Sequence, residues 1–291
     1  MSFGKLQEIA DLCEKQKKEF WQIIIENDMK ERNVTFEQSF SEMEKMLEAM
    51  IYADENYDGT LRSASGLSGG DGAKLEAFRK QPNRLVGDFI TEVMEKAVKM
   101  AESNACMKRI VAAPTAGSCG IIPAVLLTYK KQYNASNEQI VKALYVAAGI
   151  GEVIATAACI AGAEGGCQAE IGSSAAMASG AITFLEGGSA GEILNSVALC
   201  LKNMLGLTCD PVAGLVEVPC IKRNVYGAVN AVISSQMTKA GVKSAIPADE
   251  VIDSMGRIGH LIPPCLRETS QEGLATTATA EKIVKKLASQ F

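Results

Sequence analysis

The 291-residue sequence predicts an all-α protein, a compact multi-helix domain whose glycine-rich inter-helix loops carry the functional site. Three observations support this prediction. From about Leu85 almost to the end of the chain, apolar residues recur at helical spacing. Long runs of Val, Ile and Thr that alternate with polar residues, as in half-buried strands, are absent. Aromatic residues make up only 5% of the chain, few for the core of an all-β sandwich.

The first part of the chain predicts a helical hairpin. Across residues 3–54, charged and apolar residues alternate at helical spacing, with a break near Asn33 that separates two helices. Thr35 stands where its side chain would cap the second helix. We therefore expect residues 1–57 to form an N-terminal hairpin that packs on a helical body of residues 58–291, as parts of one continuous domain.

The segment of residues 58–74, DGTLRSASGLSGGDGAK, is too rich in Gly and Ser to predict a helix. A loop of this length inside a compact domain is usually functional or disordered. A plain linker between the hairpin and the body is the alternative interpretation.

From there to the end, the pattern predicts helices that are separated by loops. Ser136 is the expected cap of the helix that begins at residue 137. The other expected helices cover residues 88–103, 122–133, 175–185, 189–205, 225–240, 248–258 and 279–290.

Residues 143–163 need separate consideration, because their length would suffice to span a membrane. Glu152 lies near the centre of this segment, and a carboxylate in the middle of a bilayer is costly. Most of the other residues are small, which lets neighbouring helices approach closely. We therefore expect a buried central helix of a soluble bundle, and no membrane partner.

Charge and cysteine content exclude further classes. The net charge is −5, so the surplus of Lys and Arg that marks a nucleic-acid-binding surface is missing, and no nucleic-acid partner is expected. Residues 1–19 are charged and have no apolar signal-peptide core, which predicts a cytoplasmic protein. Nine cysteines, an odd number, argue against a disulfide framework. In a reducing compartment such thiols are buried apolar side chains, metal ligands or reactive groups.

Three of the cysteines, Cys167, Cys209 and Cys220, stand out because each lies close to a glycine pair or a proline that turns the backbone. Thiolates presented from turns can converge on an iron–sulfur cluster from several directions. The intervals between them match neither a zinc ribbon nor a ferredoxin motif. From spacing alone, structural cysteines therefore remain an open alternative to a metal site.

Motifs spread over most of the chain make a more specific case. The residues of these motifs resemble those of the α chain of the iron–sulfur-dependent bacterial L-serine dehydratases. The motifs are SGLSGGD at 65–71, APTAGSCGIIP at 113–123, EGGCQAEIG at 164–172, CDPVAGLVEVPC at 209–220 and EGLA at 272–275.

The resemblance implies an L-serine ammonia-lyase that converts L-serine to pyruvate and ammonia with a [4Fe–4S] cluster and no pyridoxal phosphate. It makes residues 58–291 an iron–sulfur catalytic domain and assigns Cys167, Cys209 and Cys220 as the cluster ligands. Three thiolates leave one iron without a protein ligand. That iron would act as a Lewis acid toward the serine hydroxyl, which is otherwise a poor leaving group.

The resemblance also implies a partner, because a catalytic residue is missing from this chain. In the family, a Ser-His-Thr motif of a β domain or β subunit is thought to supply a catalytic histidine, and that motif does not occur here. We therefore expect the base to come from a β subunit, and no catalytic residue is assigned in this chain. The single histidine, His260, is interpreted as structural. The fourth iron ligand is left open between water and a partner residue.

Two glycine-rich loops are expected to bind L-serine, because their hydroxyls and unobstructed backbone amides suit its polar groups. The second loop runs into a helix, whose first amides favour the substrate carboxylate. A phosphate site is the rival interpretation, but neither loop has the Lys-Ser/Thr ending of a P-loop. Ordinary turn geometry is the other alternative. The candidate substrate-binding residues are Ser65, Ser68, Gly69, Gly70, Thr115, Gly117 and Ser118.

Two other functions are considered. The first is a structural or redox-sensing iron–sulfur protein without turnover. The second is a pyridoxal-phosphate lyase, which would need a lysine for a Schiff base, and no lysine lies in a recognisable cofactor motif. Glu164, Glu170 and Glu217 flank the three cysteines, where they could tune a cluster, bind the substrate ammonium or form ion pairs with Lys222 or Arg223.

Overall fold

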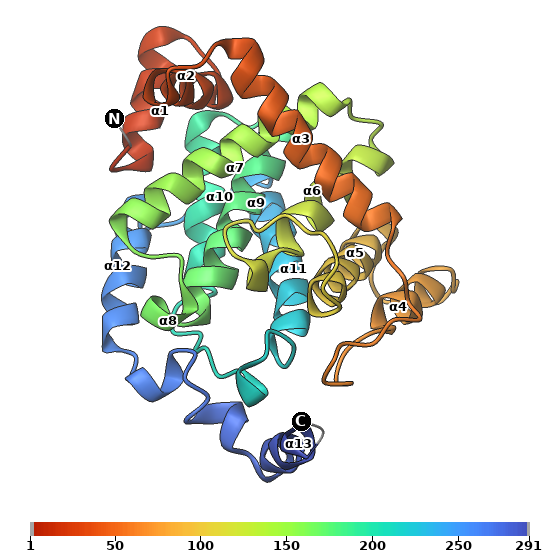
Figure 1. The fold of residues 1–291 in the computed structure, drawn as a ribbon. Coiled ribbons are helices and arrows are strands. Elements are labelled where there is room, and N and C mark those ends of the chain that lie inside the picture. The colour runs from red at the N-terminus through yellow and green to blue at the C-terminus, as the bar shows by residue number, and fades with distance from the viewer. Residues whose placement is uncertain (1–2, 290–291) are drawn as a thin grey trace.

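The computed structural model describes residues 3–289, and within that range the chain forms helices and no β-strand (Figure 1). The all-α prediction is confirmed. The α-helices are α1 (Leu6–Gln16), α2 (Phe20–Arg32), α3 (Phe36–Glu55), α4 (Asp71–Arg79), α5 (Asp88–Ala105), α6 (Ile121–Gln132), α7 (Asn137–Ala157), α8 (Gly162–Gly165), α9 (Ser173–Leu185), α10 (Ala190–Lys202), α11 (Cys220–Lys239), α12 (Ala248–Leu261) and α13 (Ala278–Ala288). Short 3-10 turns are η1 (Ala116–Ser118), η3 (Val212–Gly214), η4 (Pro264–Leu266) and η5 (Gly273–Thr276), and η2 (Gln168–Gly172) is a π-helical turn.

Helices α7 and α9 lie at the centre of the bundle, and α10 and α11 pack against α9 (Figure 1). Among the described residues, α7 is the one helix long and apolar enough to cross a membrane. Of its most apolar stretch, 67% is buried inside the protein. This burial is what we expect of the core helix of a bundle.

Glycines let these central helices approach closely. A Cβ on Gly180 of α9 would lie under 3.0 Å from Ile150 Cδ1 of α7. A Cβ on Gly149, on another face of α7, would lie equally close to Ile24 Cδ1 of α2. The Gly- and Ala-rich composition of this region therefore reflects tight helix packing.

The N-terminal region differs from the prediction in one respect: it contains three helices and not two. The break at Asn33 and the cap at Thr35 are confirmed, since the Thr35 hydroxyl accepts a hydrogen bond from Gln38 N at 3.3 Å. A second break follows α1, where Lys17 adopts a left-handed conformation at φ 56°. No glycine occurs at this turn in the sequence, so the residue pattern did not predict a break between α1 and α2.

The predicted loop at residues 58–74 is shorter than expected, because α4 begins at Asp71. A carboxylate from another helix explains this start. Glu102 of α5 accepts hydrogen bonds from the backbone amides of Asp71 at 2.9 Å and Gly72 at 3.1 Å. It thus does for α4 what a local capping side chain does for other helices.

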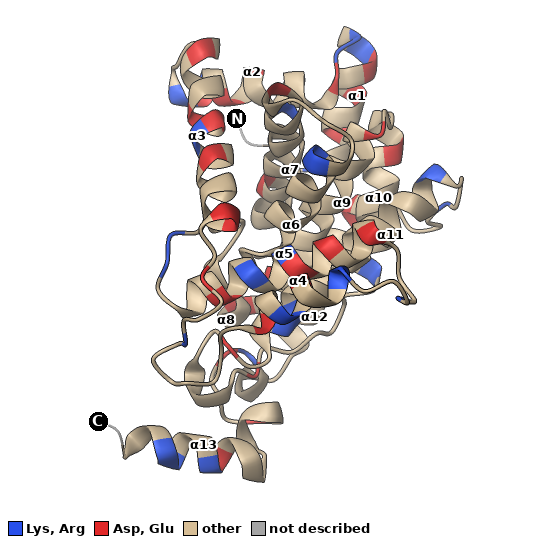
Figure 2. Ribbon diagram, turned by 90° about the vertical axis from the view of Figure 1, so that its right-hand side faces the viewer, with Lys and Arg blue, Asp and Glu red and all other residues tan. Residues whose placement is uncertain are grey.

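Helix α5 buries charged residues that are paired with its neighbours. Glu95 accepts hydrogen bonds from Arg79 Nε at 2.6 Å and Lys99 Nζ at 2.7 Å, and Glu92 accepts one from Lys131 at 2.7 Å. Figure 2 shows the two signs interleaved along α4 and α5. Such pairing is required, because an unpaired charge is costly to bury.

One hydrophobic cluster extends from α1 to α12, and α2 and α3 pack on α7. The division of the chain into residues 1–57 and 58–291 stays a prediction. The predicted helices of the body are present, with shifted ends. Helix α11 starts five residues before the predicted boundary, at Cys220, and residue 290 of the last predicted helix lies outside the described residues.

The close approach of α7 and α9 generates a first prediction. We expect Gly180→Ala to destabilise the protein by about 1–3 kcal/mol, because the added methyl overpacks Ile150. This cost exceeds the gain in helix propensity of about 1 kcal/mol. Urea unfolding followed by circular dichroism measures the change. Gly191→Ala, where a Cβ meets no atom within 4 Å, is the matched control and should keep or raise stability. A Gly180→Ala protein as stable as that control would contradict this view of the packing.

Candidate functional site

Two of the predicted metal ligands meet in one buried group. The Sγ atoms of Cys167 and Cys209 and a carboxylate oxygen of Glu170 all lie within 4.8 Å of one another. Cys167 is 1% exposed and Cys209 is 2% exposed. Thiolate sulfur is the ligand type that iron–sulfur clusters use, and this donor set fits a metal group. Residues 42 positions apart in the sequence are thus brought together by the fold.

The position of Cys167 follows from the glycine turn before it. Gly166 has φ +75°, and a Cβ there would lie 2.8 Å from Leu207 O, so this close approach requires glycine. The next residue, Gln168, donates its backbone N–H to the same Leu207 O at 3.0 Å. The Gln168 side chain bonds to Gly206 N at 2.9 Å and Met255 O at 3.0 Å. Cys167 is therefore fixed against the loop that carries Cys209.

Cys209 is held on its other side by the chain that follows α12. Its N–H donates to Leu266 O at 2.9 Å, and its carbonyl accepts from Glu268 N at 2.7 Å. This isolated pairing of Cys209 with Arg267 runs parallel. The pairing places a segment of the C-terminal part of the chain directly beside the site.

The third predicted ligand, Cys220, is the first residue of α11 and is 7% exposed. It is not part of the group within 4.8 Å. Burial raises the pKa of Cys220 to about 12, and the charges of Cys167 and Glu170 add to the shift. Cys220 therefore lies close enough to Cys167 to experience its charge. The assignment of the three cysteines as ligands stays a prediction.

The hydrogen bond between Cys167 and Cys209 makes the two thiols unequal. The bond from the Cys209 S–H lowers the pKa of Cys167, and burial acts in the opposite direction. The same bond, together with burial, raises the pKa of Cys209. A Cys167 thiolate would thus be stabilised in part by Cys209, and the surroundings must supply the rest of the stabilisation.

Arg223 supplies a positive charge beside that thiolate. Its guanidinium donates to Thr208 O at 2.8 Å and to Asp210 Oδ1 at 2.9 Å, and it lies close enough to Cys167 to lower the pKa of that thiol. Sequence reasoning considered Arg223 only as an ion-pair partner of nearby glutamates. Its position three residues after Cys220, on the same helix face, was the signal that could have identified it.

Glu170 connects the cysteines to the second glycine-rich loop. The Thr115 hydroxyl hydrogen-bonds to Glu170, and a Cβ on Gly117 would lie 3.4 Å from Glu170 Oε1. Burial raises the pKa of Glu170, and the Thr115 hydrogen bond partly opposes this. Two of the predicted substrate-binding residues therefore lie beside the sulfur atoms, through a carboxylate that sequence analysis mentioned without a definite role.

Asn224 joins the second loop to α11. Its side chain donates to Gly117 O at 2.7 Å and accepts from Gly120 N at 2.9 Å. Ser118, the third candidate in this loop, is fully buried, and its hydroxyl lies 3.4 Å from Thr115 N. Since Asn224 follows Arg223 directly, one turn of α11 positions both the loop and the cysteine region.

The first glycine-rich loop is held by two buried carboxylates. Glu217 accepts hydrogen bonds from Ser63 Oγ at 2.7 Å and from Ser65 Oγ at 2.9 Å. Glu102, which caps α4, also accepts from Gly69 N at 3.2 Å. Neither pairing follows from sequence spacing, because the partners are far apart in the chain.

The remaining loop candidates are placed as follows. Ser68 is buried and donates its N–H to Ser63 Oγ at 3.2 Å. Gly70 precedes α4 with φ +83°. A cavity of 490 Å³ opens beside the loop, and Ser65, Glu217 and residues of α13 line it. Of the candidates in this loop, Ser65 is the one that lines this cavity.

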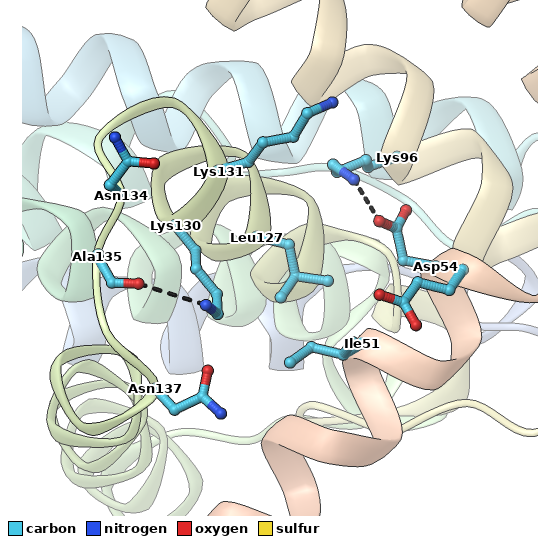
Figure 3. Close-up of a pocket in the computed structure, with 10 residues that line it drawn as sticks. Ile51, Asp54, Lys96, Leu127, Lys130, Lys131, Asn134, Ala135 and Asn137 are labelled. Carbon is cyan, nitrogen blue, oxygen red and sulfur yellow. Dashed lines mark hydrogen bonds and ion pairs between the residues drawn. The ribbon is translucent and has the colours of Figure 1, made fainter.

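Another cavity, of 570 Å³, lies between α3, α6 and the start of α7 (Figure 3). Lys96 and Asp54 form an ion pair in its wall, and Lys130 Nζ bonds to Ala135 O at 3.4 Å. None of the predicted site residues lines this cavity. His260 is exposed in the last turn of α12, where Nδ1 lies 2.8 Å from Gly256 O.

Comparisons with known proteins identify the family of this chain. Residues 15–275 match the family described as serine dehydratase alpha chain. A probable L-serine dehydratase, alpha chain, of Bacillus subtilis is 43% identical over 98% of this chain and 95% of its own length. The L-serine dehydratase, alpha chain, of Peptoniphilus asaccharolyticus is 38% identical over 95% of each chain. An L-serine dehydratase of Helicobacter pylori is 34% identical over 94% of this chain, which spans 62% of that longer protein. By the extent and identity of these matches, the chain belongs to the serine dehydratase alpha chain family.

Proposed function

We propose that this chain is the α subunit of a cytoplasmic L-serine ammonia-lyase, which forms pyruvate and ammonia from L-serine. The observation that carries the proposal is the buried meeting of Cys167 and Cys209 beside Glu170, in a chain of the serine dehydratase alpha chain family. Nine cysteines without a disulfide, in the part of the chain described, support a reducing compartment.

Cys167, Cys209 and Cys220 would hold a [4Fe–4S] cluster. When bound, a cluster with one iron free of protein ligands supplies a Lewis acid for the serine hydroxyl. The three cysteines come from three different segments and are buried, which suits thiolate ligands that must exclude competing water. Arg223 offsets part of their negative charge, because its guanidinium lies close enough to Cys167 to lower the pKa of that thiol.

The second glycine-rich loop and Glu170 would orient the substrate. Thr115 and Gly117 lie beside the Glu170 carboxylate, next to the sulfur atoms. The half-buried Glu170 carboxylate is a suitable partner for the substrate ammonium, since a charge-assisted hydrogen bond is stronger than one between neutral groups. Ser65, with its neighbour Glu217, would line the approach from the 490 Å³ cavity.

A β subunit would supply the base that removes the α-proton. Three observations support a missing part. The Ser-His-Thr motif is absent from the sequence, and the single histidine, His260, is exposed and bonded to Gly256. This chain also spans only 62% of the Helicobacter pylori relative, so that protein contains further sequence that a separate chain could provide here.

Removal of a ligand tests the proposal directly. We expect anaerobic reconstitution to give wild-type protein the visible absorbance of an iron–sulfur cluster, and pyruvate formation from L-serine once the β chain is added. Cys167→Ala, Cys209→Ala and Cys220→Ala should each lose the cluster absorbance and reduce activity to background. Iron and sulfide analysis and a coupled pyruvate assay measure the two effects.

Cys13→Ala is the matched control, because Cys13 is a buried apolar side chain of α1 and should keep both properties. A cluster that survives the loss of all three cysteines would refute the ligand assignment. L-Serine should change the electron paramagnetic resonance spectrum of the reduced cluster. An unchanged spectrum, with no turnover, would favour the structural or redox-sensing alternative.

The role of the second loop gives a further prediction. Thr115→Val keeps the shape of the side chain but removes the hydroxyl that lowers the pKa of Glu170 and lies 3.2 Å from Ser118 Oγ. We expect the KM for L-serine to rise about fivefold, which corresponds to a net hydrogen-bond contribution of about 1 kcal/mol, while cluster content stays unchanged. Thr128→Val is the control, since the buried Thr128 hydroxyl has no hydrogen-bond partner. Equal KM values for both variants would speak against substrate binding at this loop.

A further inference from the structure

Arg223 makes contacts with every segment that carries a predicted cluster ligand. It lies on α11, three residues after Cys220, and its side chain is only 15% exposed. From there the guanidinium reaches Cys167 and the carbonyl of Thr208, the residue before Cys209. Since guanidinium donors form a rigid planar fork, simultaneous contacts of this kind fix the relative positions of the groups they join.

Asp210 holds the guanidinium in place. Its side chain is 6% exposed, and Oδ1 accepts from Arg223 while Oδ2 accepts from Leu274 N at 2.9 Å. A Cβ on Gly273 would lie 2.6 Å from the same Oδ2, so this approach of the backbone requires glycine. The EGLA motif at 272–275 therefore has a physical role, because it secures the carboxylate that orients Arg223.

The charges around the sulfur atoms make this cation important. Glu170 lies within 4.8 Å of Cys167 and Cys209, and Glu268 is bonded through its N–H to the Cys209 carbonyl. Three thiolates would add negative charge to this buried region. A cation in contact with one of them stabilises the added charge, and in particular any further electron on a bound cluster.

We propose that Arg223, oriented by Asp210, is a positioning residue that holds the three ligand segments together and raises the reduction potential of the cluster. This inference rests on the proposed function, because it needs a cluster bound by Cys167, Cys209 and Cys220. It assigns the pair a role distinct from that of any residue that touches L-serine.

The test compares Arg223→Gln, Arg223→Lys and Asp210→Asn with wild type, each reconstituted anaerobically. Three readouts apply: iron and sulfide content, the rate of cluster loss in air, and the midpoint potential from a dithionite titration followed by electron paramagnetic resonance. Arg257→Gln is the matched control, since Arg257 forms an exposed ion pair with Asp253 on α12. It should match wild type in all three readouts.

Opposite shifts in potential are the signature of the proposal. Arg223→Gln removes the cation, so its potential should become more negative and its cluster should be lost severalfold faster. Asp210→Asn leaves the cation without its counter-charge, so its potential should become more positive. Arg223→Lys should keep a potential near that of wild type but lose the cluster faster, because an ammonium cannot reproduce the planar fork.

Several results would overturn the inference. One is an Arg223→Gln protein with wild-type cluster retention and potential. Another is a shift of the same sign in Arg223→Gln and Asp210→Asn, which indicates a structural disturbance only. If Arg223→Gln does not fold, judged by circular dichroism, the Asp210→Asn and Arg223→Lys proteins decide the question. A wild-type protein that takes up no cluster would refute the proposed function and this inference together, whereas the first two results refute this inference alone.

Discussion

Sulfur atoms that carry charge inside a protein need a partner that replaces the water they have lost. In this protein the partner of Cys167 is Arg223, and Asp210 and the Thr208 carbonyl use the other donors of the guanidinium. The contact joins α11, the turn before η2 and the loop before η3. It adds a side-chain link to the hydrogen bonds of Gln168 with Leu207 O and Gly206 N, which hold Cys167 against the loop of Cys209.

The helical core provides the rigid frame for that contact. Helix α9 follows the η2 turn directly, and α11 packs against α9, so Cys167 and Cys220 are both attached to the central helices. Glycines such as Gly149 and Gly180 permit the tight spacing of α2, α7 and α9. Side chains supported by packed helices have more precisely fixed positions than side chains on free loops. A site for a small substrate requires this precision.

The glycine-rich loops are ordered by carboxylates and not by their own composition. Glu102 accepts amides from the start of α4 and from Gly69, while Glu217 accepts the hydroxyls of Ser63 and Ser65. Glu170 does the same for Thr115 beside the sulfur atoms. A loop rich in Gly and Ser loses much conformational entropy on ordering, and these buried acceptors offset that cost. Glu170, in the group with Cys167 and Cys209, and Glu217, three residues before Cys220, thereby connect the two loops to the cysteine region.

Local patterns in the sequence determined the helical class, the long buried helix α7 and the caps at Thr35 and Ser136. These features depend on neighbours within one or two turns, so the order of residues suffices to predict them. The sequence motifs identified the family and made Cys167, Cys209 and Cys220 candidate cluster ligands. The spacing of these cysteines alone left structural roles possible.

Tertiary structure alone decided which distant groups meet. The break at Lys17 depends on a left-handed residue that is not glycine. Three other features depend on partners far apart in the chain: the start of α4 at Asp71, the approach of Glu170 to Cys167 and the hydrogen bonds of the Arg223 guanidinium. Such contacts form because whole helices pack against one another, and no periodicity or spacing records which side chains then face each other.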